Sequence, residues 1–191
     1  LTAIRTHGAS GKHLSEGERS MLAMFKESAV AYMHEQQGTI IPFYAFYTPM
    51  ENFLDHSHRS VIIKAYENDY INPDHKTGDV FAINVLKTLF LIKYVQDMTP
   101  NIDNITTLMM DNLEEDRITL KGNVEEALKV LIRQMLVQKN GESYVFLTNE
   151  FTKYRKWSLK ISSRTKNTAI LNSTDAIHSA SIRPSMNTPI K

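Results

Sequence analysis

The chain has 191 residues, of which 42% are hydrophobic, enough to build the core of one domain or of two small ones. It contains no cysteine, which excludes disulfide bonds and thiol chemistry and fits a reducing cytoplasm. Since no apolar run reaches about 18 residues and no secretory signal is recognisable, we expect a cytoplasmic protein with no membrane partner.

The net charge of +1 hides an uneven distribution along the chain. Residues 151–191 carry eight Lys or Arg and one acid, whereas the first 150 residues carry 14 basic and 20 acidic side chains. The tail is also rich in Ser and Thr, a composition that buries little surface. We expect residues 151–191 to be a poorly structured basic tail. One alternative is that the tail is a nucleic-acid-binding arm. Another is that it is translated from a reading frame that does not belong to the domain.

Residues 1–14 have the character of a loop, and the first helix is predicted over residues 16–37. Ser15 and Glu18 form a capping box, in which each side chain satisfies a backbone donor of the other residue. Gly38 is a suitable residue to end this helix.

The pair Gly11-Lys12 suggests a phosphate-binding loop, but the glycine and the Ser or Thr that such a loop requires are missing at the necessary spacing. Arg19, in the first turn of the predicted helix, is more informative. The helix dipole favours an anion there, so a phosphate would suit this cation. The alternative is a solvated helix residue that pairs with Glu16 or with an acidic residue elsewhere in the chain.

The aromatic segment 39–47 contains Pro42, which argues against a central strand, and we expect a buried connector. A second helix is predicted over residues 49–68, with Thr48 as the cap and Pro49 in the first turn. Residues 69–78 form a polar break, the best internal boundary.

Asp55, His56 and His58 resemble a metal cluster. His56 and His58, however, are two residues apart and would point to different sides of a helix, whereas zinc-binding histidines on a helix are four apart. A surface hydrogen bond is the simpler interpretation, and we predict no metal site. The sequence also offers no nucleophile with a base and an orienting acid, so no catalytic residue is predicted.

The segment from residue 79 to 150 has the order of a winged helix: three helices closed by a hairpin. Asn140-Gly141 between two alternating runs is a strong signal for the hairpin turn. The predicted elements are helices over residues 79–98, 103–110 and 123–136, a short strand at 118–120, and hairpin strands at 137–139 and 143–147.

A winged helix would ordinarily suggest DNA binding, but residues 79–150 contain seven basic and eleven acidic side chains. Glu125 and Glu126 open the predicted recognition helix, where contacts to DNA are usually made. Duplex binding requires phosphate neutralisation, so this acidity favours a protein partner. The candidate DNA contacts are the basic residues Lys121, Lys129, Arg133 and Lys139.

A helical segment that opens with Ser15-Glu16-Gly17-Glu18-Arg19, followed by a winged helix, resembles the C-terminal end of AAA+ ATPases. The closer likeness is to the large P-loop ATPases of BREX phage-defence systems (the BrxC/PglY group). It lies in the phrase that begins at Ser10-Gly11-Lys12, in Ile41-Pro42-Phe43-Tyr44 and in Phe146-Leu147-Thr148-Asn149-Glu150. The resemblance covers about residues 1–150, and the tail departs from it.

This resemblance implies a mainly α protein, with a helical lid-like segment (1–70), a linker (71–78), a winged-helix domain (79–150) and a tail (151–191). It implies that the chain lacks Walker A and Walker B, is not an enzyme by itself and binds no cofactor alone. ATP and Mg²⁺ belong to the full-length relative. Arg19 would sense the nucleotide, and the partners would be the rest of the ATPase, other defence-system proteins or DNA.

The first hypothesis is therefore a non-catalytic region that couples nucleotide state to DNA or partner engagement. The alternative is a stand-alone winged-helix DNA-binding protein. A third possibility is an enzyme of unknown type that uses segment 40–47 as a pocket wall.

Overall fold

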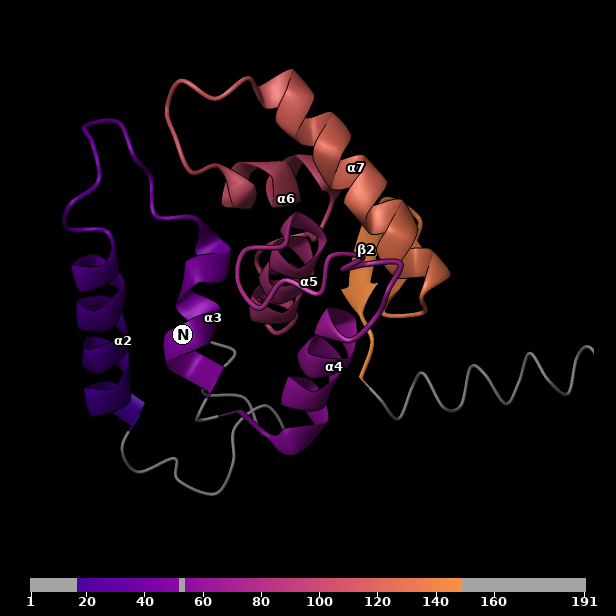
Figure 1. Ribbon diagram of the computed structural model, residues 1–191, viewed down its shortest axis with the longest axis horizontal. Helices are drawn as coiled ribbons and strands as arrows, with labels where there is room; N and C mark the ends of the chain where they lie inside the picture. The colour runs from indigo at the N-terminus through magenta and orange to yellow at the C-terminus, as the bar shows by residue number, and fades with distance from the viewer. Residues whose placement is uncertain (1–16, 52–53, 149–191) are drawn as a thin grey trace, which may run out of the picture. The chain divides into compact units, whose positions relative to one another are not determined.

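The computed structural model describes residues 17–51 and 54–148, with side chains from residue 22 onward, and all of them belong to one compact unit that ends at Thr152 (Figure 1). As predicted, this unit is mainly helical, with a small antiparallel hairpin. Its elements are α2 (Gly17–Ala31), η2 (Phe43–Phe46), α3 (Tyr47–Met50), α4 (His56–Tyr66), α5 (Phe81–Ile92), α6 (Ile102–Met109), α7 (Arg117–Arg133), β1 (Val137–Asn140) and β2 (Ser143–Phe146).

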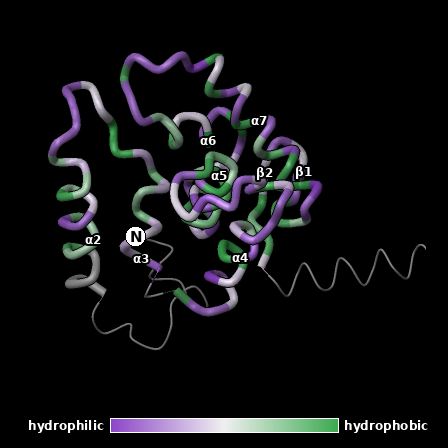
Figure 2. The backbone as a smooth tube through the Cα atoms, in the orientation of Figure 1, coloured by the Kyte–Doolittle hydropathy of each residue, from purple (hydrophilic) through white to green (hydrophobic). Residues whose placement is uncertain are grey.

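Helix α5 is the centre of the unit, and η2, α4, α6, α7 and β2 all pack against it. Nine of its twelve residues are buried, so α5 is a helix buried on most sides. The hydropathy of the chain follows this arrangement, since hydrophobic residues gather at α5 (Figure 2). Within the described part of the chain, no helix is both long and apolar enough to cross a membrane.

The predicted hairpin is confirmed. Strands β1 and β2 pair antiparallel, with Asn140 opposite Ser143, and Gly141 in the turn has a φ of 59°, which a glycine tolerates. The backbone N–H of Tyr144 also donates to the carbonyl of Pro100 at 2.9 Å. The segment that precedes α6 therefore lies along the edge of β2 that β1 leaves free.

The prediction of one helix over residues 49–68 is wrong. Tyr47–Met50 forms the short helix α3, and α4 begins only at His56. Asp55 has an extended backbone, and its carboxylate accepts a hydrogen bond from the backbone N–H of Ser57. Asp55 is therefore the N-cap of a new helix, and its capping geometry interrupts the apolar pattern on which the prediction rested.

The predicted strand at residues 118–120 is also wrong, because these residues belong to the first turn of α7. Asp116 caps this helix by accepting hydrogen bonds from the backbone N–H groups of Ile118 and Thr119. The cap and the buried series that runs from Leu120 to Leu131 outweigh the strand preference of the β-branched residues. The helix therefore begins six residues before the predicted start.

Two predicted helices are longer than the observed ones. Helix α2 ends at Ala31 instead of Gln37, and α5 occupies only the middle of the predicted range 79–98. Gly38, with a φ of 95°, turns the chain after α2 so that Ile40 can donate to the carbonyl of Asp111. The polar break at 69–78 is confirmed as a loop, held by the buried side chain of Asn72.

Candidate functional site

Arg19, the predicted nucleotide sensor, belongs to the first turn of α2. Its side chain lies outside the described residues, as does the capping residue Ser15. Its role therefore remains an inference from the sequence.

The basic side chains at the start of α7 are turned toward α6. Lys121 forms an ion pair of 2.7 Å with Asp103, and the guanidinium of Arg117 donates to the hydroxyl of Thr107 at 2.9 Å. Hydrogen bonding to Lys121 lowers the pKa of Asp103, which keeps that carboxylate charged. Lys121 is therefore committed to an interhelical contact.

Lys129 and Arg133 are one helical turn apart on the solvent face of α7, as the prediction required. Lys129, however, pairs with Glu126 at 2.7 Å, and this hydrogen bond raises the pKa of the lysine. Glu125 and Glu126, which were expected at the helix start, lie near its middle because α7 begins at Arg117. They are exposed together with the two basic residues.

Lys139 lies near the tip of the hairpin, where its ammonium is 5.6 Å from the centre of the Tyr144 ring. Of the four predicted DNA contacts, Lys129 and Arg133 share a face of α7, and carboxylates accompany them there.

Two further positions on the face that carries Lys129 and Arg133 are apolar or bare. Ile118 is 84% exposed, and a Cβ added at Gly122 would meet nothing within 4 Å. Glycine in a helix interior lowers stability relative to alanine, and no packing contact in the described part of the chain requires it here. This face, formed by Ile118, Gly122, Glu125, Glu126, Lys129 and Arg133, is named the α7 face below.

His58 lies in a buried cluster and not on the surface. It is 4% exposed, its ring stacks on Phe146, and its Nε2 is 2.9 Å from the hydroxyl of Tyr94. Among the described residues, no group of three or more His, Asp or Glu side chains is placed to hold a metal ion. His58 is thus a core residue with a hydrogen-bonded partner.

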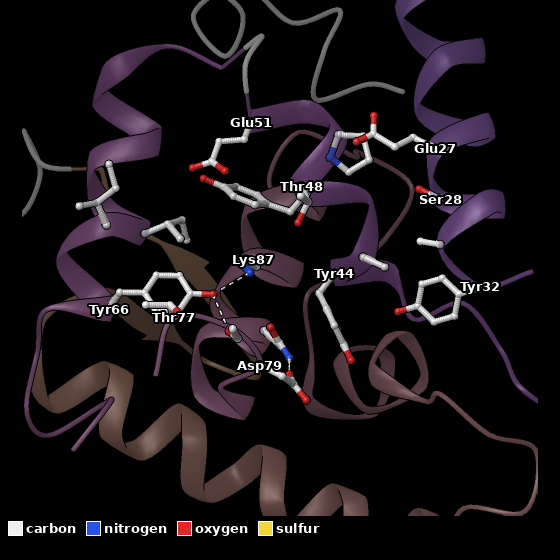
Figure 3. Close-up of a pocket in the computed structure, with 18 residues that line it drawn as sticks. Glu27, Ser28, Tyr32, Tyr44, Thr48, Glu51, Tyr66, Thr77, Asp79 and Lys87 are labelled. Carbon is white, nitrogen blue, oxygen red and sulfur yellow. Dashed lines mark hydrogen bonds between the residues drawn. The ribbon is translucent and has the colours of Figure 1, made fainter. Parts of the chain in front are cut away.

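The structure adds a site that the sequence analysis missed, a pocket of about 630 Å³ between α2, α3, α4, α5 and the loop that ends at Asp79 (Figure 3). In the close-up, Tyr66 and Lys87 lie on one side, and Glu27 and Ser28 of α2 lie on the other, together with Tyr32, which follows α2. Segment 40–47, which was considered as a pocket wall, contributes to the lining through η2 and α3.

Among the described residues, Lys87 is the only basic one that lines this pocket, against the three carboxylates of Glu27, Glu51 and Asp79. Its ammonium donates to the hydroxyl of Tyr66 at 3.1 Å and is about equally distant from the ring centres of Tyr47 and Tyr66, 5.5 and 5.4 Å. The Tyr66 hydroxyl in turn donates to the carbonyl of Gly78. The hydrogen bond to Tyr66 and the contacts with the two aromatic rings fix Lys87 at the pocket wall.

Two hydroxyl groups in the lining are buried without a hydrogen-bond partner among the described residues. They belong to Ser28 and Tyr47, which are 4% and 2% exposed. Burial raises the pKa of Tyr47, and the nearby charge of Glu51 adds to the effect. Both groups therefore remain protonated donors.

No sequence signal joins these pocket residues, because they come from five separate helical elements and a loop and follow no spaced motif. Comparison with known proteins does not extend the assignment: no protein-family model and no solved structure matches the chain.

Proposed function

We propose that this chain is a non-catalytic interaction module, the C-terminal lid-like and winged-helix region of a BREX-type P-loop ATPase. In this role it couples the nucleotide state of the ATPase to a protein partner that contacts the α7 face.

The order of α5, α6, α7, β1 and β2 supports a winged-helix arrangement of the second half. The hydrogen bond between Tyr144 and Pro100 adds to this support, because it places a third extended segment beside the hairpin. The likeness of residues 1–150 to the BREX ATPases supplies the rest of the proposal.

The composition of the α7 face is the reason to propose a protein partner and not a DNA duplex. Two acidic and two basic side chains lie on it, so that it has no net charge, and Ile118 and the bare Gly122 occupy its N-terminal half. A duplex-binding surface needs basic side chains that are available to phosphates, whereas Lys121 and Lys129 already pair with carboxylates. An exposed isoleucine beside a glycine suits a surface that binds a protein better than a surface that binds DNA.

The proposal is tested in trans with a BREX-type ATPase that has been truncated before its lid-like segment. We expect this chain alone to hydrolyse no ATP and to change the ATPase rate of the truncated enzyme when added to it. Arg19→Ala should abolish the change, whereas Lys26→Ala, an exposed substitution on the same helix, should preserve it. Turnover by the chain alone, or no effect in trans, would contradict the proposal.

A stand-alone DNA-binding protein is the second candidate. The adjacency of Lys129 and Arg133 on the α7 face is the observation that favours it. It predicts duplex binding that weakens steeply with salt and that depends on these two residues.

A further inference from the structure

The pocket between α2, α3, α4 and α5 contains two polar groups that the described residues leave unsatisfied. The hydroxyls of Ser28 and Tyr47 are buried and have no hydrogen-bond partner there. A buried hydroxyl without a partner destabilises the folded chain, so its retention points to a partner that arrives from outside.

The donors in this pocket match a negatively charged or carbonyl oxygen. An ammonium has three N–H donors, and Lys87 uses one of them on Tyr66. The Tyr66 hydroxyl already donates to Gly78, so it does not compete for a ligand. The ammonium of Lys87 lies 5.5 Å from the centre of the Tyr47 ring, so the two side chains belong to the same wall.

The rest of the lining is suited to bind a cationic group. Glu27, Glu51 and Asp79 outnumber Lys87, so the lining carries a formal charge of −2. Tyr32 and Tyr44 add aromatic rings. Burial raises the pKa of both hydroxyls, and the nearby charge of Asp79 adds to the effect. Carboxylates beside aromatic rings attract ammonium and guanidinium groups, and the same negative charge repels phosphate.

We propose that this pocket binds a free amino acid with a cationic side chain. The carboxylate of the ligand contacts Lys87 and the hydroxyl of Tyr47, and its cationic groups contact the carboxylates of the lining and the rings of Tyr32 and Tyr44. The volume of about 630 Å³ lies within the range of small-molecule sites, roughly 300 to 1,000 Å³. This inference does not depend on the proposed function.

The test is isothermal titration of the whole purified chain with L-arginine. Agmatine, which is arginine without its carboxylate, and inorganic phosphate are the comparison ligands. We expect L-arginine to bind at least about tenfold more tightly than agmatine, because agmatine cannot accept hydrogen bonds from Lys87. Phosphate should not bind.

Variants separate a ligand site from a structural role. Tyr47→Phe removes one oxygen atom and keeps the ring, and Lys87→Met keeps the aliphatic stem. Each should weaken arginine binding at least about tenfold, and Tyr47→Phe should leave the melting temperature of the ligand-free chain equal or higher. Lys129→Met, on the α7 face, is the matched control and should bind arginine as the original chain does.

Three outcomes would overturn the proposal. The first is the absence of arginine binding at millimolar concentration. The second is binding that Lys87→Met and Tyr47→Phe leave unchanged. The third is phosphate binding that equals or exceeds arginine binding. None of them bears on the in-trans ATPase test, so the two proposals fail separately.

Discussion

His58 is the clearest example of a residue whose role its surroundings decide. The hydroxyl of Ser57 donates to Asp55, so Nδ1 of His58 carries the proton and donates to Ser57, and Nε2 accepts from the Tyr94 hydroxyl. Burial lowers the pKa of His58, and the nearby Lys93 lowers it further. Both ring nitrogens are therefore satisfied in the neutral form.

This arrangement predicts a stability that falls in mild acid. The unfolded chain takes up the proton at the ordinary histidine pKa of 6.5, whereas the folded chain takes it up only at a lower pH. The contribution of His58 is fully present above pH 6.5 and is lost as the pH falls toward the folded pKa. Urea unfolding at pH 7.5 and pH 5 measures the loss.

The control for this prediction is His58→Gln, which removes the titration. The variant should be less stable at pH 7.5 but should lose less free energy of unfolding between the two pH values. An equal loss in both proteins would show that other groups cause the acid sensitivity.

The pocket residues show why the sequence alone does not predict this site. Lys87 and Tyr47 are separated by 40 residues, and each fits the pattern of a packed helix. The pairing of their side chains arises from the packing of α3 on α5. No local rule specifies that contact, so the pocket could be found only from the structure.

At the scale of elements, α7 has one face that packs closely in the core and an opposite, solvent-exposed face that contributes little to its stability. Its buried residues, Leu120, Val124, Ala127, Leu128 and Leu131, hold it against α5 and α6. Gly122 lies on the opposite side with open space around it. The helix therefore contains a glycine at a position where this residue lowers helix stability.

Gly122→Ala should stabilise the chain by about 1 kcal/mol, because alanine has the higher helix propensity and a Cβ there meets no atom. Gly141→Ala is the matched control. Its φ of 59° strains any residue with a side chain, so this variant should lose about 1 kcal/mol or more. Urea unfolding of both variants checks the pair, and a destabilising Gly122→Ala would reveal a packing role.

The elements that the sequence predicted correctly are those with strong local signals. Asn140-Gly141 specifies the hairpin turn, and the dense apolar run specifies α5 as a buried helix. Two of the failures lie at helix starts, where Asp55 and Asp116 act as N-caps that the predicted boundaries did not include. One carboxylate that accepts backbone hydrogen bonds changes the boundary in each case.

At the scale of the whole molecule, one hydrophobic core unites the described residues from Met24 on α2 to Phe146 on β2. Charged side chains remain outside it, and the ion pair on α7 is one reason for our proposal that this helix binds a protein and not DNA. The central claim is that the α7 face is not a duplex-binding surface.

Fluorescence anisotropy with a labelled DNA duplex, over a series of salt concentrations, tests this claim. The basic tail is present in every sample, so only a comparison of variants isolates the α7 face. The variant is Lys129→Glu with Arg133→Glu. The control, Lys26→Glu with Lys76→Glu, makes the same charge change at exposed positions elsewhere.

We predict that the original chain, the variant and the control bind the duplex equally at each salt concentration. The contradicting result is steeply salt-dependent binding that the α7 variant loses and the control keeps.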